Sequence, residues 1–149
     1  MNNGSFFLSG AIAALVGVFH RFFLLFCFVY IAAYSPVPRF FADAGLTGWT
    51  FRLANFSVDF STHVLLSFPA AFVLSKLRPA NTLLYFAAAL LPSFLYFNSV
   101  WIGHPMFGQV WPTLLTGWFT ELMALPTAFF ILMQLRNRIQ QRFRARKGL

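Results

Sequence analysis

The stretch LLSFPAAFVLSKLR, from Leu65 to Arg78, has a counterpart later in the chain, LMALPTAFFILMQLR, from Leu122 to Arg136. Each is an apolar run that contains a proline, continues with Ala-Phe and ends at a basic residue. A helix of about 20 apolar residues crosses the ~30 Å hydrocarbon core of a bilayer, and Lys and Arg gather at its cytoplasmic end. The two stretches therefore predict membrane-spanning helices that run in the same direction.

The composition of the whole chain agrees with a membrane location. Of the 149 residues, 59% are hydrophobic and only 9% are charged, against about 25% charged residues in an ordinary soluble domain. A soluble protein of this size has too little interior to bury so much apolar surface. We therefore predict an all-α integral membrane protein and exclude the soluble globular classes.

Four apolar stretches approach the length of a membrane span: 22–41, 58–75, 82–101 and 112–133. Residues 5–19 are also apolar but are shorter, and His20 and Arg21 follow them. An arginine at the centre of the bilayer costs about 2.5–3.5 kcal/mol on insertion scales. We therefore expect the helix to break or bend near His20, with residues 5–19 in the interface or against the bundle. The alternative is a fifth, short span, which would place the N-terminus outside.

The predicted architecture is a four-transmembrane-helix bundle in a single membrane domain, residues 1–149. Its parts are an N-terminal accessory helix, a first helix pair, a second helix pair and a basic tail, in residues 1–20, 21–78, 81–138 and 139–149. A two-span unit returns to its starting side, so a duplicated unit keeps its direction and gives a parallel repeat. The alternative is a chance match in a chain rich in Leu, Phe and Ala.

The distribution of basic residues predicts the orientation. One side receives Arg21, Lys76, Arg78 and the tail, and the other receives Arg39 and Arg52, which is nine cations against two. The positive-inside rule then places both termini in the cytoplasm, and we expect a bacterial-type inner membrane. We also expect lipid headgroups to contact the tail cations Arg136, Arg138, Arg142, Arg144, Arg146 and Lys147.

The second helix pair resembles a family of small bacterial inner-membrane proteins of unknown function that are built from a two-helix unit. The matching residues are Trp111, Trp118, Ala128, Phe129 and Arg136, which follow the family's pattern of two tryptophans, Ala-Phe-Pro and a basic stop. In this chain the proline precedes Ala-Phe instead of following it. The resemblance implies a helical inner-membrane protein and carries no catalytic residue.

Three prolines, Pro69, Pro92 and Pro126, lie near the middle of predicted spans. Each removes a backbone donor and frees the carbonyl four residues earlier, which is costly in lipid unless another group bonds to it. We expect helix kinks at these prolines, with the carbonyls bonded by the nearby hydroxyls of Ser67, Ser93, Thr120 and Thr127. The kinks would open a vestibule or hinge, or they would only shape the packing.

Glu121 lies about nine residues into the fourth predicted span, which is ~13 Å deep at 1.5 Å per residue. Carboxylates within spans are rare, face the protein interior and mark functional sites. Gly117, Ala124 and Ala128 share its helix face, and small residues permit close helix contact. We therefore expect Glu121 to face another helix, where it would be a titrating group, a cation site, a counter-ion or a neutral hydrogen-bonded packing residue.

Asp59 and His63 are four residues apart and share one helix face. Such a pair can orient an imidazole for proton transfer or form a simple surface hydrogen bond. His104 is expected on the same outer side. These residues and Glu121 could hold a metal ion, but the spacing does not demand it. We predict no metal, no cofactor and no catalytic residue.

Three classes of function remain. We favour a non-catalytic channel or transporter-like component, or a partner subunit of a membrane complex. It would self-associate or bind another membrane protein, with the bilayer as its other partner and no nucleic acid. One alternative is a proton-coupled carrier or membrane enzyme that uses Glu121 with Asp59 and His63. The other is a pore-forming effector or immunity-type membrane protein.

Overall fold

The computed structural model describes residues 3–77, 82–101, 104 and 107–147. Within these residues the structure is 93% helix and contains no strand. The elements are α1 (Asn3–Tyr34), α2 (Val37–Asp43), α3 (Gly48–Lys76), α4 (Thr82–Asn98), the short 3₁₀ helix η1 (Ser99–Trp101) and α5 (Phe107–Lys147). The all-α prediction is confirmed.

In the part of the chain that the structure describes, four helices are long and apolar enough to cross a bilayer, which agrees with a multi-pass membrane protein. Their candidate spans are Phe7–Ile31, Gly48–Lys76, Thr82–Trp101 and Thr113–Phe143. The 41 residues of α5 extend about 61 Å at 1.5 Å per residue. Since this is about twice the thickness of the hydrocarbon core, the basic end of α5 continues as helix beyond any span.

The first span differs from the prediction. Helix α1 runs without interruption through His20 and Arg21, and the span covers Phe7–Ile31 instead of 22–41. The expected break near His20 and the alternative fifth span are therefore both wrong, and no separate accessory helix exists within 3–20. The physical reason is that His20 and Arg21 bind partners on other helices, as described below. The helix ends at Tyr34 because Pro36 disfavours a helical conformation in the residue before it.

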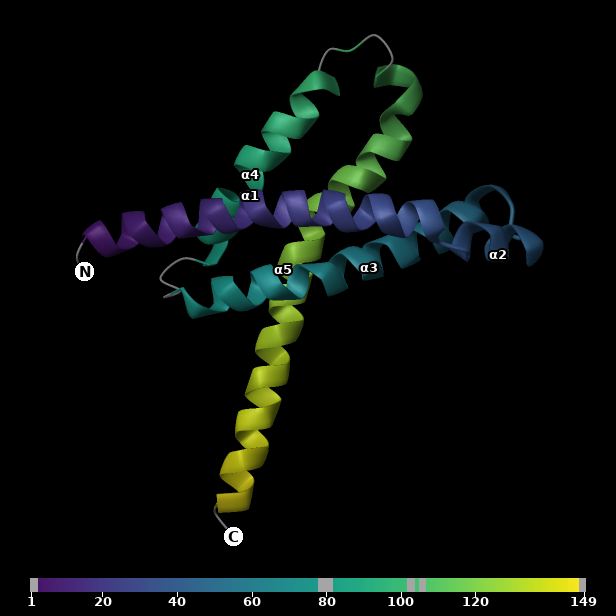
Figure 1. Ribbon diagram of the computed structural model, residues 1–149. Coiled ribbons are helices and arrows are strands. Elements are labelled where there is room, and N and C mark those ends of the chain that lie inside the picture. The colour runs from purple at the N-terminus through teal and green to yellow at the C-terminus, as the bar shows by residue number, and fades with distance from the viewer. Residues whose placement is uncertain (1–2, 78–81, 102–103, 105–106, 148–149) are drawn as a thin grey trace.

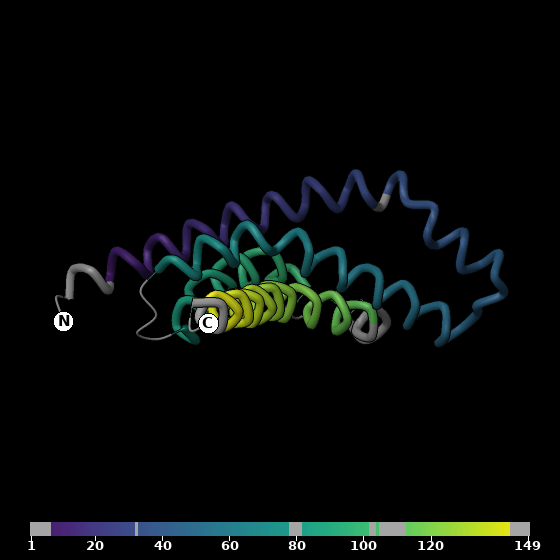
Figure 2. The backbone as a smooth tube through the Cα atoms, turned by 90° about the horizontal axis from the view of Figure 1, so that it is seen from below, coloured from purple at the N-terminus to yellow at the C-terminus, as the bar shows by residue number. Residues whose placement is uncertain are grey.

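The two helical pairs cross each other. Helices α1 and α3 run antiparallel, and α4 and α5 pass across them (Figure 1). The most extensive packing joins α3 to α5 and α1 to α4, so it connects the two halves of the chain (Figure 2). A parallel two-helix repeat would pair the first helix of one half with the first of the other in this way. The repeat itself stays a prediction.

Small residues bring these helices close together. A Cβ atom added to Gly17 of α1 would overlap the backbone carbonyl of Ala89 in α4. In α3 and α5, Ala71, Ala124 and Ala128 are fully or almost fully buried in the same core cluster. Because membrane helices lack a hydrophobic drive to associate, such close backbone contact supplies much of their packing energy.

The three prolines lie inside helices that continue past them. The hydroxyls expected to bond the freed carbonyls bond other groups instead. They donate to carbonyls three or four residues earlier in their own helices, as Ser67 to His63, Ser93 to Leu90 and Thr120 to Thr116. This local bonding is common for Ser and Thr within helices, and it makes the predicted role of these three hydroxyls wrong. The kinks stay a prediction.

Candidate functional site

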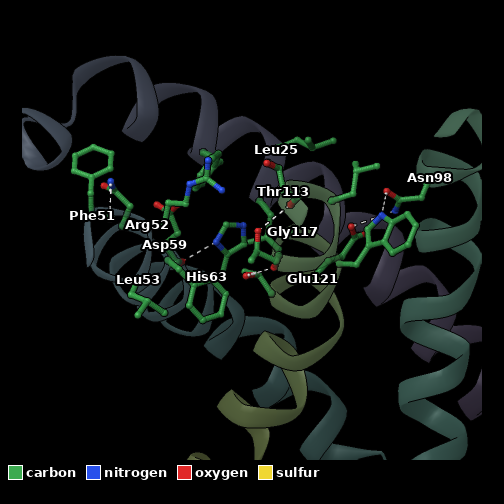
Figure 3. A pocket seen from close by; sticks show the side chains of 18 of the residues that line it. Leu25, Phe51, Arg52, Leu53, Asp59, His63, Asn98, Thr113, Gly117 and Glu121 are labelled. Atoms are coloured by element: carbon green, nitrogen blue, oxygen red, sulfur yellow. Dashed lines mark hydrogen bonds between the residues drawn. The ribbon is translucent and has the colours of Figure 1, made fainter. Parts of the chain in front are cut away.

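A cavity of about 760 Å³ lies between α1, α3 and α5, and Asn98 of α4 also lines it (Figure 3). Ligand pockets typically have volumes of about 300–1,000 Å³. The cavity extends from Trp49 and Arg52, which are exposed near the start of α3, to Glu121, whose side chain is 11% exposed. Its walls are mainly apolar and include the aromatic rings of Trp49, Phe28, Phe51, Phe56 and Trp118.

A buried ion pair lies at the deep end of this cavity. Arg21 Nη1 of α1 is 3.2 Å from Glu121 Oε1 of α5, and the two side chains are 19% and 11% exposed. The guanidinium also lies 5.2 Å from the ring centroid of Phe97. Arginine keeps its proton in proteins, so Glu121 is its counter-charge. The prediction that Glu121 faces another helix is confirmed, and its partner is a residue that sequence reasoning assigned to the cytoplasmic edge.

Asn98 extends this pair into a network. Its Nδ2 donates to Glu121 Oε2 at 3.3 Å and to the carbonyl of Phe94 at 2.9 Å. Its Oδ1 accepts a hydrogen bond of 2.7 Å from Trp118 Nε1. These bonds fix the orientation of the amide and connect α4 to α5, while the ion pair of Glu121 with Arg21 adds α1 to the network. Sequence reasoning missed Asn98, although an amide at the end of an apolar span was a signal for such a contact.

His20 anchors α1 to α3 beside the ion pair. Its side chain is buried, and its Nε2 lies 3.2 Å from Ser67 Oγ. Ser67 uses its single hydroxyl proton to donate to the carbonyl of His63 at 2.7 Å, so His20 Nε2 is the donor in the contact with Ser67. His20 and Arg21 are adjacent in sequence, and together they fix the middle of α1 to two different helices.

Asp59 and His63 both line the cavity, as their shared helix face predicts. The two side chains do not bond to each other as a carboxylate–imidazole pair. Instead, His63 Nδ1 donates to the backbone carbonyl of Asp59 at 2.8 Å. The ring of His63 packs 4.8 Å from that of Phe28. Within the described part of the chain, the carboxylate of Asp59 has no hydrogen-bond or ion-pair partner.

His104 lies apart from these residues. It is exposed, and its ring is 5.7 Å from that of Trp101. Among the described side chains, no three His, Cys, Asp or Glu residues gather closely enough to hold a metal ion. Of the four candidate residues, Asp59, His63 and Glu121 line the same cavity, and His104 is not among its lining residues.

The basic tail continues α5. Arg136, Arg138 and Arg142 are exposed on it, and the side chains of Arg144, Arg146 and Lys147 lie outside the described residues. Because Arg21 is inside a span, the count of flanking cations becomes eight against two. The orientation and the headgroup contacts stay predictions.

Comparison with known protein families, curated sequences and solved structures gives no match for this chain. The resemblance to the two-helix inner-membrane family therefore stays a prediction, and one of its residues, Trp111, has a side chain outside the described part.

Proposed function

We propose that the chain is a non-catalytic, transporter-like membrane protein and that the cavity is its solute-binding site. The observation that carries this proposal is the Arg21–Glu121 pair, which lies at the deep end of a ligand-sized cavity. Charged groups within spans are costly and typically mark solute or ion pathways. An ion pair that only stabilised helix packing would not need a cavity beside it.

The same pair favours a carrier over an open channel. Arg21, Glu121 and Asn98 connect α1, α4 and α5 at the deep end of the cavity. A solute would pass this point only when these contacts separate, which is the behaviour of a gate. Glu121 is already engaged by a cation and an amide, so its geometry gives no particular support to catalysis or proton coupling.

We place the protein in a bacterial-type inner membrane with both termini in the cytoplasm, supported by the cation count of eight against two. The cavity mouth then faces the opposite side, because it lies at the beginning of α3 while the basic tail lies at the end of α5. Self-association or binding to another membrane protein remains part of the proposal. Large exposed side chains such as Phe19 and Leu83 suit either lipid or protein neighbours.

The test uses the full chain in nanodiscs and three aromatic probes of similar size: phenethylammonium, 3-phenylpropionate and 3-phenylpropan-1-ol. Trp49 and Trp118 line the cavity, so binding is followed by tryptophan fluorescence and confirmed by equilibrium dialysis. We expect at least one probe to bind saturably, and its uptake into proteoliposomes to saturate in the same concentration range.

Gly117→Phe provides the site-filling variant. Gly117 lines the cavity, and a Cβ atom there meets nothing within 4 Å, so the added ring enters the cavity without a backbone clash. Gly10→Phe is the matched control, because Gly10 also has open space around it and lies outside the cavity. We expect binding to weaken at least tenfold in Gly117→Phe only. The proposal fails if no probe binds saturably, or if Gly117→Phe binds like the wild type.

A further inference from the structure

Several polar groups of the cavity wall keep hydrogen-bond acceptors free, beside the donors of Arg52 and of Arg21, whose buried Nε has no hydrogen-bond partner among the described residues. Thr116 and Thr120 donate their hydroxyl protons to carbonyls of their own helix, at 2.8 and 2.9 Å. Asn55 donates its Nδ2 to the carbonyl of Phe51 at 3.2 Å. After these bonds, the groups keep Oγ1 and Oδ1 lone pairs for a ligand.

Asp59 and His63 provide the strongest acceptors. Since a carbonyl only accepts, the bond from His63 Nδ1 to the backbone of Asp59 places the ring proton on Nδ1. In its neutral form, the ring presents Nε2 as an acceptor. One helical turn away is the carboxylate of Asp59, which has no partner within the described residues, and both side chains lie on the cavity side of α3 (Figure 3).

The charged side chains of the cavity wall also favour a ligand that donates hydrogen bonds. Arg21 is neutralised by Glu121 at 3.2 Å. Arg52 is exposed near the start of α3, and its guanidinium lies 5.4 Å from the ring centroid of Trp49. Asp59 lies two turns further along α3, is exposed on the cavity side and interacts electrostatically with His63. It is the carboxylate of the wall that has no ion-pair partner among the described residues.

Aromatic rings complete the site. Phe28 and Phe56 line the cavity, and the faces of aromatic rings carry negative potential that attracts cations. Their edges and the neighbouring leucines accommodate an apolar body. A ligand that fits such a wall brings its own N–H donors and a positive charge.

We infer that the solute is an organic cation, an ammonium group on an apolar or aromatic body, bound by Asp59 and His63. The inference rests on the proposed function and names its solute class. The ammonium N–H groups donate to the carboxylate and to Nε2, and the body packs on the aromatic wall.

The experiment compares the same three probes on the full chain in nanodiscs. We expect phenethylammonium to bind at least tenfold more tightly than 3-phenylpropionate and 3-phenylpropan-1-ol. Trimethylation of its nitrogen removes the N–H donors but keeps the charge, and we expect this to weaken binding severalfold. Equal or tighter binding of the carboxylate or the alcohol overturns the inference.

Three variants test the role of Asp59 in binding. Asp59→Asn removes the charge, and we expect it to weaken phenethylammonium binding at least tenfold. Asp43→Asn is the matched control, because Asp43 lies on α2 outside the cavity and is 75% exposed; we expect no change. Arg52→Gln removes a like charge near the mouth, so binding is expected to stay equal or tighten. Unchanged binding in Asp59→Asn, or weaker binding in Arg52→Gln, contradicts the inference.

The outcomes separate this inference from the proposed function. If the carboxylate or the alcohol binds in a manner that Gly117→Phe abolishes, the cavity is a solute site and only the cation assignment fails. If no probe binds, both fail.

Discussion

The ion pair between Arg21 and Glu121 allows a quantitative test of the packing at the centre of the molecule. The two single variants are Arg21→Met and Glu121→Gln, and the double variant combines them. Both side chains are more than four-fifths buried, so each single change leaves an uncompensated buried charge. Gln at 121 keeps a carbonyl that accepts from Asn98, whose amide is 3.3 Å from Glu121 Oε2.

Removal of one partner of a buried ion pair costs about 3–5 kcal/mol. We therefore expect each single variant to lower the ratio of folded to unfolded protein roughly 140- to 4,000-fold, at about 1.4 kcal/mol per factor of ten. Replacement of both charges is close to neutral or is stabilising, because no buried charge remains. The double variant is thus expected to be more stable than either single variant.

The measurement is unfolding by SDS in mixed micelles, followed by tryptophan fluorescence. Arg39→Met is the matched control, because Arg39 and Asp43 are 4.0 Å apart, 90% and 75% exposed, and one helical turn apart. Such a pair contributes less than about 0.5 kcal/mol. A loss below about 1 kcal/mol in either single variant, or a double variant as unstable as the sum of the two, would refute the reasoning.

Two further predictions concern the contacts of α1. Gly17→Ala forces a Cβ atom against a backbone carbonyl of α4, so we expect it to lower the melting temperature of the protein. Gly10→Ala is the control, because a Cβ atom there meets no atom within 4 Å, and we expect it to be neutral or stabilising by up to about 1 kcal/mol. Equal melting temperatures of the two variants would contradict the close contact between α1 and α4. Ser67→Ala leaves the buried His20 Nε2 unpaired and is expected to cost about 1–3 kcal/mol in SDS unfolding. Ser61→Ala, an exposed hydroxyl bonded to its own helix, is its control, and equal losses at the two serines would show that His20 does not depend on Ser67.

Composition and hydrophobic length were sufficient to predict the helical class and the number of candidate spans. Both depend only on local sequence, since any helix in a bilayer must satisfy its backbone internally and present apolar side chains. The orientation of Glu121 toward another helix was also predictable, because Ala124 and Ala128 on its helix face permit close helix contact and are buried. Gly117 on the same face instead lines the cavity, and a Cβ atom there meets no atom within 4 Å. Asp59 and His63 were correctly placed on one face by their spacing.

The position of Arg21 could not be predicted in the same way. The sequence prediction assumed that Arg21 has no partner in the membrane. Because an unpaired arginine is costly there, it placed a break or bend of the helix near His20. Its partner, Glu121, lies on a helix about 100 residues away, and no local pattern reveals such a pairing. The sequence did contain a signal for this pairing. A cation and a carboxylate in otherwise apolar spans reduce each other's free-energy cost of insertion when they pair. The hydrogen bond from Asn98 depends on the same long-range arrangement.

The separation of Arg21 and Glu121 along the chain has a consequence for biogenesis. At about 5–20 residues per second, the ribosome completes Glu121 roughly 5–20 seconds after Arg21. During this interval α1 enters the translocon with its arginine unmatched, and it also lacks α4, the helix against which it packs most. Helices α1 and α3 are therefore expected to wait at the edge of the translocon, or with a chaperone, until α5 is made. We therefore expect the synthesis of α5 to control assembly, because Glu121 on α5 supplies the charge that pairs with Arg21 of α1.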